Sequence, residues 1–131
     1  MNKTYKNIKS MLITVDYHFE YDNSERDITL ETHESIEINS ISDSNIMLTV
    51  ERKLVFTGLS NTYLKVVYDV NISLAEKITK SKFEKDVRKG LSILGDVFSD
   101  ISLIVAQVTD KSPFGAIISP PMYDVDDIEI K

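Results

Sequence analysis

The sequence contains no cysteine, only two histidines and only four glycines, and each shortage excludes a kind of chemistry. Without cysteine there are no disulfides, thiolate metal sites, iron–sulfur clusters or cysteine nucleophiles. His18 and His33 leave little for metal binding or for acid–base catalysis at neutral pH. A phosphate-binding loop is excluded because the glycines are scattered, at Gly58, Gly90, Gly95 and Gly115. We therefore expect a protein that needs no cofactor and is not an enzyme.

Basic stripes and long apolar runs are also missing. The 21 acidic residues outnumber the 15 basic ones, so the net charge is −6 and nucleic acid is a poor candidate partner. The apolar run nearest the N-terminus, residues 11–15, ends at Asp16. It is shorter than the roughly 7–15 residues of a signal peptide, and no run reaches the roughly 20 of a membrane helix. We expect a cytoplasmic protein that does not insert into membranes.

The composition that remains is typical of one soluble domain. The chain has 131 residues, of which 42% are hydrophobic and 27% charged. We predict a single domain over residues 1–131, with a core over 10–125 and an acidic tail over 124–131. The tail carries Asp124, Asp126, Asp127 and Glu129 without the spacing or the glycine of a calcium loop, so a solubilising role is the better interpretation.

Hydrophobic periodicity predicts four strands followed by helix. Apolar and polar residues alternate over 11–21, 27–38, 46–56 and 63–74, which is typical of an antiparallel meander with one apolar face. The period then changes to about 3.6 from Phe83 to Val108, after a possible capping box formed by Ser81 and Glu84. The fold class is therefore α+β, a four-stranded sheet with C-terminal helix on one face. Gly90 and Gly95 leave open whether this is one helix or two.

Three polar residues fall on the apolar face of the sheet, namely Thr32, Glu34 and Arg52. Glu34 and Arg52 either form a buried ion pair or lie where the sheet twists outward. A cavity between sheet and helix would make the protein a small-ligand binder of the helix-grip type, which stays an alternative function. His18 and His33 would approach one another only if the first two strands pair, and we favour two solvated side chains over a metal site.

The helical region carries more apolar surface than one sheet can cover. Besides its main stripe it has a second set, Ile93, Val97, Leu103 and Ile104. A helix with two apolar faces needs a second partner, so we predict an oligomer interface at these residues. The alternative is that residues 114–121 cover them within the same chain.

Apolar residues also occur on the polar faces of the predicted strands and in loops. Exposed apolar surface flanked by charge marks interaction sites, and a groove for an extended polypeptide is the site that we infer. The candidate client-binding residues are Leu12, Met47, Val55, Leu59, Val67, Phe114, Ile117 and Ile118.

Two segments resemble the SecB family of protein-export chaperones. Residues 15–23 are similar to the first SecB strand, which reads D-x-x-F-E-x-x-N and is matched by Asp16, Phe19, Glu20 and Asn23. Residues 114–121, FGAIISPP, resemble the short proline-bounded segment that closes the SecB fold. The order of strands, helix and closing segment matches over about residues 10–125. The chain is thereby identified as a divergent SecB-like protein.

The resemblance implies a cytosolic, ATP-independent holdase that binds non-native polypeptides in apolar grooves. Family members are tetramers, dimers of dimers with helices between the sheets, and hand clients to the SecA motor. Some relatives instead guard an antitoxin in toxin–antitoxin–chaperone systems. Asp16 and Glu20 match the acidic pair that contacts SecA, so they are SecA-contact candidates. Residues 96–101 lack the F-P-Y-A-R-E-like run of the export chaperones, which leaves SecA pairing and the choice of dimer or tetramer open.

Overall fold

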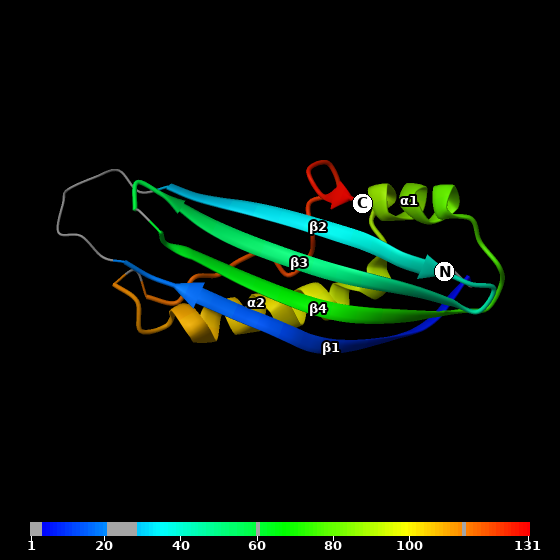
Figure 1. Cartoon of the computed structure of the whole chain (residues 1–131), viewed down its shortest axis with the longest axis horizontal. Coiled ribbons are helices and arrows are strands. Elements are labelled where there is room, and N and C mark those ends of the chain that lie inside the picture. Colours follow the sequence, from blue (N-terminus) through cyan, green and yellow to red (C-terminus); the bar gives the residue numbers. More distant parts are fainter. Residues whose placement is uncertain (1–3, 21–28, 60, 114) are drawn as a thin grey trace.

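The computed structural model describes residues 4–20, 29–59, 61–113 and 115–131 (Figure 1). Their elements are the strands β1 (Tyr5–His18), β2 (Thr29–Ile41), β3 (Asn45–Thr57), β4 (Tyr63–Leu74) and β5 (Glu129–Ile130), and the helices α1 (Lys80–Lys89), η1 (Ser92–Leu94) and α2 (Gly95–Thr109). The four predicted strands are present, although β1 begins six residues earlier than its periodicity suggested. The helical region is interrupted between the two glycines, which answers the question of one helix or two.

The predicted α+β class is confirmed, but the predicted meander is wrong. The sheet order is β1-β4-β3-β2-β5, so β1 pairs antiparallel with β4 and not with β2. Strands β2, β3 and β4 are neighbours in chain order, and β1 lies beside β4, on the side away from β3. This is a Greek-key arrangement. Alternation along a strand specifies which face is buried, but it does not specify which strand lies alongside.

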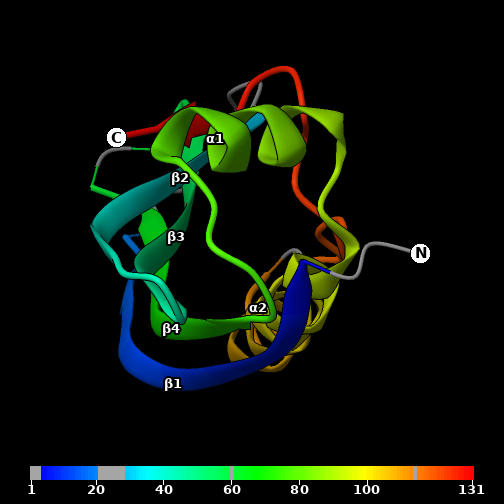
Figure 2. The same cartoon turned by 90° about the vertical axis from the view of Figure 1, so that its right-hand side faces the viewer.

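The sheet curls, and both α-helices lie on its inner side (Figure 2). Strands β3 and β4 supply fully buried side chains at every second position, so their predicted faces are confirmed. α1 adds Phe83 and Val87, while α2 adds Phe98, Ile101 and Val105. The stretch Ser92–Thr109 is long and apolar enough to cross a membrane by length and composition, a test that core helices also pass. Here its buried side chains pack against the sheet.

A β-bulge in β1 reverses part of the predicted face assignment. The register shifts between Leu12 and Thr14, so Leu12 lies opposite the inner-face residue Tyr68 and Met11 lies opposite the outer-face residue Asp69. Leu12 was expected on the polar face and Met11 on the apolar face, and both expectations are wrong. One extra residue on a strand moves every side chain before it to the other face.

Helix α1 begins two residues before the predicted N-cap and ends at the first of the two glycines that suggested a break. Its N-cap is Thr79, whose hydroxyl accepts a hydrogen bond of 3.1 Å from the Lys82 amide. Ser81, the predicted N-cap, lies inside the first turn, so the capping-box prediction is wrong. The helix ends at Gly90, whose φ is +92°. Residues with a Cβ atom rarely adopt a positive φ, whereas glycine does so readily.

A buried carboxylate joins α1 to the start of β1. The Tyr5 hydroxyl donates to Asp86 at 2.7 Å and the Lys82 ammonium donates to it at 2.9 Å. Burial raises the pKa of Asp86, but the hydrogen bonds from Lys82 and Tyr5 outweigh it and hold that pKa below its ordinary value. Burial and the bond to Asp86 raise the pKa of Tyr5.

Acid is therefore expected to weaken the fold at Asp86. A carboxyl group whose pKa is lower in the folded state stabilises the fold above its unfolded pKa, and the gain is lost as pH falls through the folded value. Asp86→Asn should reduce stability at neutral pH and flatten the decline in the free energy of unfolding as pH falls below about 5, measured by urea unfolding across pH. Tyr5→Phe keeps the carboxylate and removes one donor, so its effect should be smaller. An unchanged acid slope in Asp86→Asn contradicts this assignment.

Candidate functional site

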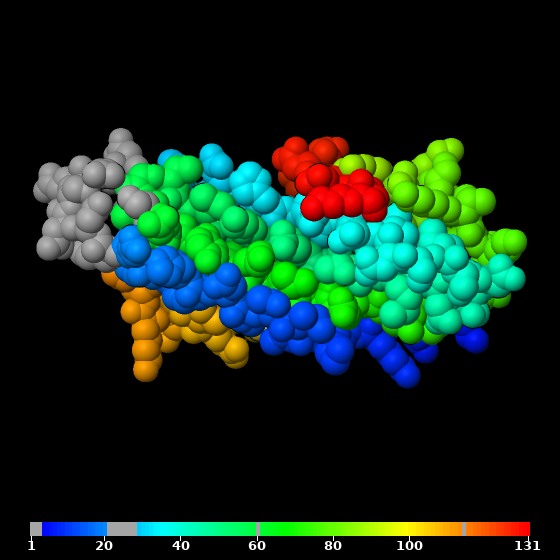
Figure 3. Space-filling view, viewed as in Figure 1, coloured from blue at the N-terminus to red at the C-terminus, as the bar shows by residue number. Residues whose placement is uncertain are grey.

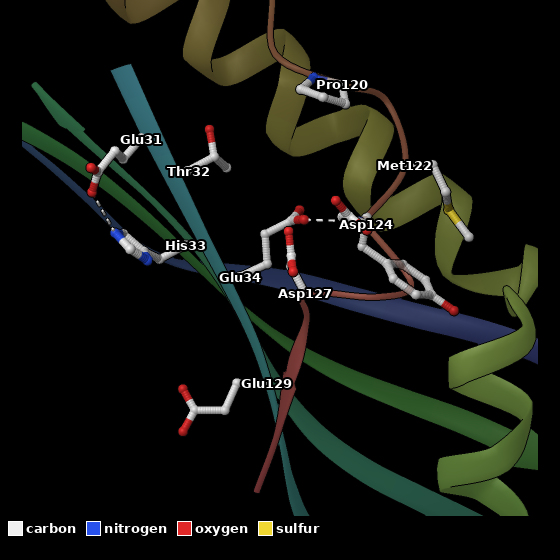
Figure 4. Close-up of a pocket in the computed structure, with 10 residues that line it drawn as sticks. Glu31, Thr32, His33, Glu34, Pro120, Met122, Asp124, Asp127 and Glu129 are labelled. Atoms are coloured by element: carbon white, nitrogen blue, oxygen red, sulfur yellow. Dashed lines mark hydrogen bonds and ion pairs between the residues drawn. The ribbon is translucent and has the colours of Figure 1, made fainter. Parts of the chain in front are cut away.

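A groove runs between β2 and the segment that follows α2, and it is the candidate functional site (Figure 4). Its volume is about 740 Å³. We call it the β2 groove; it is lined by Glu31, Thr32, His33, Glu34, Pro120, Met122, Tyr123, Asp124, Asp127 and Glu129. Thr32 and Glu34 point from β2 toward the closing segment, while Glu31 and His33 point to the other face of the sheet (Figure 4).

Arg52 holds the two sides of the groove together. Its side chain is 0% exposed, and its Nε and one terminal nitrogen donate to Glu34 Oε2 at 2.9 and 2.6 Å. The guanidinium also donates to the Ser119 hydroxyl at 3.1 Å and to the carbonyls of Pro120 and Met122 at 2.6 and 3.3 Å. Of the two possibilities open for Glu34 and Arg52, the buried ion pair is the correct one. This pair positions the closing segment on the sheet.

Further contacts fix the segment beyond residue 122. The Tyr123 hydroxyl donates to the Val87 carbonyl at 2.6 Å and accepts from the Leu91 amide at 2.7 Å, and burial raises its pKa. Arg88 donates to the Ile128 carbonyl at 2.5 Å, and the Ile128 side chain is buried. Residues 124–131 are therefore packed against the domain and do not form a free tail. The four acidic side chains of this segment are exposed, so their solubilising role stays a prediction. Figure 3 shows these residues lying between β2 and α1.

The outer edge of β2 is covered along only part of its length. Strand β5 pairs in parallel with Ser35 and Ile36, and Lys131 exchanges hydrogen bonds with the Ile36 carbonyl and the Ile38 amide. No strand in the described part of the chain pairs with the outer edge of residues 29–34. Because backbone groups alternate in direction, the even-numbered residues Leu30 and Thr32 present their N–H and C=O groups at this edge, as Ile36 and Ile38 do.

The groove is acidic as well as open to backbone pairing. Its carboxylates are those of Glu31, Glu34, Asp124, Asp127 and Glu129. The charge of Glu34 is neutralised by Arg52, and the Glu31 carboxylate lies 3.5 Å from Nε2 of His33. A free strand edge beside uncompensated carboxylates suits an extended chain that carries lysine or arginine. Among the described residues, no three metal-binding side chains are grouped to hold an ion. His18 and His33 lie on β1 and β2, with β4 and β3 between them.

The predicted client-binding residues do not form one groove. Leu59 is only 7% exposed and belongs to the interior, so its assignment is wrong. Met47, Val55 and Val67 lie on the outer face of the sheet, where Met47 and Met11 border a small hollow of about 240 Å³. Ile117 is half-buried, Ile118 is 82% exposed and Leu12 lies toward the inner side of β1. Phe114 lies outside the described residues. The site role of the exposed residues stays a prediction.

The β2 groove itself was missed in the sequence. One signal for it was present, because Glu34 and Arg52 interrupt the apolar face of two strands that pair directly. What lies opposite Arg52 could not be inferred, since Ser119, Pro120 and Met122 are some 70 residues further along the chain. Thr32, Asp124 and Asp127 also line the groove, and sequence reasoning did not assign them to a client-binding site.

The two SecA-contact candidates lie at one end of β1. Asp16 is opposite Lys65 on the outer face and accepts a hydrogen bond of 3.2 Å from the Tyr63 hydroxyl, whose pKa this bond raises. Glu20 lies just beyond the strand, 3.1 Å from His18. Their role as a SecA contact stays a prediction.

The predicted oligomer interface is only partly at the surface. Val97 is 0% exposed and packs in the core, so it is not available to a partner. Ile93 and Ile104 are half-buried, and Leu103 is 61% exposed. Leu103 is therefore the member of this set that remains fully open to a second copy.

Comparisons with known proteins agree with the fold. No family model matches the sequence, and no curated protein matches it. The structure is similar to that of the Mycobacterium tuberculosis SecB-like chaperone Rv1957, solved in complex with a ChAD peptide from the antitoxin HigA1 (Rv1956). The TM-score is 0.56 at 8% identity, over 88% of this chain and 86% of the other. A Streptococcus agalactiae protein of unknown function aligns over 88% of this chain and 99% of its own, with 8% identity and a TM-score of 0.45. The chain has the SecB-like fold that its sequence motifs implied.

Proposed function

We propose that this SecB-like domain is an ATP-independent holdase chaperone that binds extended, non-native polypeptides in the β2 groove. The observation that carries the proposal is the free edge of residues 29–34 beside an acidic groove whose two sides are joined by buried Arg52. An added strand pairs through backbone groups, which every polypeptide offers, so recognition does not depend on one client sequence.

Affinity then comes from three physical sources. Backbone pairing supplies hydrogen bonds, and apolar side chains of the client gain about 25 cal/mol per Å² of surface that they bury. The groove carboxylates attract basic client segments, which raises the association rate. None of these needs a nucleotide, a cofactor or a catalysed reaction, so the protein acts without being an enzyme. We place it in the cytoplasm, with polypeptide partners and no affinity for nucleic acid or membrane.

The holdase activity is tested by diluting a denatured model protein into buffer with and without this chain. We expect light scattering from the aggregating client to be suppressed at a small molar excess of chaperone. Unchanged aggregation at several-fold excess, together with no measurable binding of an unfolded peptide, would reject the proposal.

Thr32→Pro is expected to weaken peptide binding about 5- to 10-fold, because it removes an edge N–H that a client would use. Proline is tolerated at an edge where the N–H faces away from the sheet, so the domain should still fold. Thr32→Val is the matched control, since it keeps the backbone donor and nearly the same side-chain shape. Fluorescence anisotropy of a labelled basic peptide measures both; equal affinities for the two variants would exclude strand addition at this edge.

Two kinds of partner are compatible with the proposed site. The structurally similar chaperone binds an antitoxin peptide, and an antitoxin is the client that we favour here, because residues 96–101 lack the SecB run that the export chaperones carry. Delivery to SecA through Asp16 and Glu20 is the other candidate. Genes for a toxin and an antitoxin beside the gene for this chain would favour the first, and pull-down of SecA from the native cytosol would favour the second.

We also propose that the protein is a homo-oligomer. Apolar side chains are exposed along the open edge of β1, at Met11, Leu12, Ile13 and Val15, and on α2 at Leu103. Burial of such surface between copies is favourable. Leu103→Asp is expected to shift the sedimentation coefficient toward that of a monomer, with exposed Gln107→Asp as the control. The same species for both variants would mean that α2 is not the interface.

A further inference from the structure

The last residues of the chain occupy the edge that the proposed client would use. Strand β5 pairs with Ser35 and Ile36, and Lys131 bonds to the backbone of Ile36 at 2.8 Å and of Ile38 at 3.0 Å. This is the outer edge of β2, in direct line with the open stretch 29–34. An extended polypeptide that pairs with β2 beyond residue 34 therefore meets β5.

The attachment of this segment changes abruptly at Ile128. Up to that residue the chain is held by buried side chains, since Tyr123 is 4% exposed and Ile128 is 1% exposed. Beyond it, Glu129 and Lys131 are exposed and Ile130 is only half-buried. These three residues are held mainly by backbone pairings of the kind that a client strand would reproduce, and only Ile130 also packs its side chain against the core. Their release would leave the anchor at Ile128 in place.

We infer that β5 is an internal occupant of the client site, which a sufficiently long client displaces from β2. The inference rests on the proposed function and adds a regulation to the same groove. Displacement extends the available edge from residues 29–34 to residues 29–38, or from about 20 Å to about 33 Å of strand. A short client pairs with the open stretch alone, whereas a long one has to compete with β5.

Competition of this kind lowers apparent affinity in proportion to the fraction of molecules in which the edge is free. Ending the chain at Ile128 removes the competitor, so a basic extended peptide of about ten residues should bind about 10-fold more tightly to the shortened chain than to the full chain. A peptide of about five residues, which fits the open stretch, should bind both chains equally. Fluorescence anisotropy with the two labelled peptides gives the four dissociation constants.

A control separates pairing from charge, because the shortened chain also lacks one acidic and one basic side chain. Glu129→Gln with Lys131→Gln keeps the backbone of β5 and removes both charges. Because Glu129 is one of the groove carboxylates, this variant should bind both basic peptides slightly more weakly than the full chain, and it should not tighten binding of the long peptide. If shortening fails to tighten binding of the long peptide, or tightens both peptides equally, β5 is not a competitor. If neither chain binds either peptide, the proposed function itself fails.

A second measurement uses the full chain alone, so it holds even if the shortened chain is unstable. Amide hydrogen exchange, followed by NMR, should show the Lys131 amide protected in the free protein and exposed when the long peptide is bound. The Ile38 amide should stay protected in both states, because the client takes the place of β5. Continued protection of Lys131 in the complex would overturn the inference.

Discussion

Arg52→Ala is expected to lower the free energy of unfolding by about 3–5 kcal/mol, because it leaves the buried Glu34 carboxylate without its cation. The same change removes the donors to Ser119, Pro120 and Met122, so residues 119–122 lose these three hydrogen bonds to the sheet, while the Asp124 amide still donates to Glu34. Urea unfolding followed by circular dichroism measures the loss. The β2 groove is bounded by that segment, so peptide binding should fall together with stability.

The neighbouring residue on β3 provides the control. Lys53 points to the outer face, where its ammonium lies 5.3 Å from the Tyr63 ring, and Lys53→Ala should cost less than about 1 kcal/mol. Arg52→Lys keeps the charge but has no planar fork for several acceptors, so its loss should be intermediate. Equal stabilities for Arg52→Ala and Lys53→Ala would mean that the ion pair does not hold the fold.

Phe98→Ala is expected to cost about 3–5 kcal/mol, because it leaves a cavity where the helix meets the sheet. The ring is 0% exposed. It packs 5.2 Å from the Tyr123 ring between centroids, and the Arg52 guanidinium lies 5.3 Å from its centre. From α2, the Phe98 side chain therefore supports both Arg52, which is on the sheet, and Tyr123, which lines the groove in the segment after α2.

The comparison for this variant lies on the same helix. Gln107 is exposed on α2, and Gln107→Ala should change the free energy of unfolding by less than about 0.5 kcal/mol. Both variants are compared by urea unfolding at one protein concentration, because oligomers stabilise by mass action. A loss below about 1 kcal/mol for Phe98→Ala would indicate that the surroundings collapse into the space, and that Phe98 does not support the groove.

Sequence reasoning located the strands because a half-buried strand repeats every two residues. Strands β3 and β4 alternate over their whole length, and their predicted and observed faces agree. In β1 the same rule failed before the bulge at residue 13, since an unpaired residue leaves no mark on composition. The prediction that Leu59 is exposed failed for a related reason. A loop residue follows no hydrophobic period, so its burial depends on what packs over it.

Residues 124–131 are where local reasoning was weakest. The four acidic residues among them suggested a solvated tail, yet Ile128 between them is buried and Glu129 begins a strand. Acidic residues and isoleucine alternate only over residues 127–130, and a pattern of four residues is too short to separate a tail from an edge strand. The position of β5 depends on the free edge of β2, which exists only once β1 has paired with β4.

Local periodicity and composition were sufficient to specify the α+β class, the positions of the four long strands, and Glu34 and Arg52 as charged residues on the apolar face. Two short motifs were sufficient for the resemblance to SecB. These properties depend on residues that are close together in the chain, so the sequence itself records them. The Greek-key order, the Arg52 contacts with residues 119–122 and the shared edge of β2 were decided only in three dimensions. Each of them joins segments separated by tens of residues, and no local pattern records which distant segment will lie alongside.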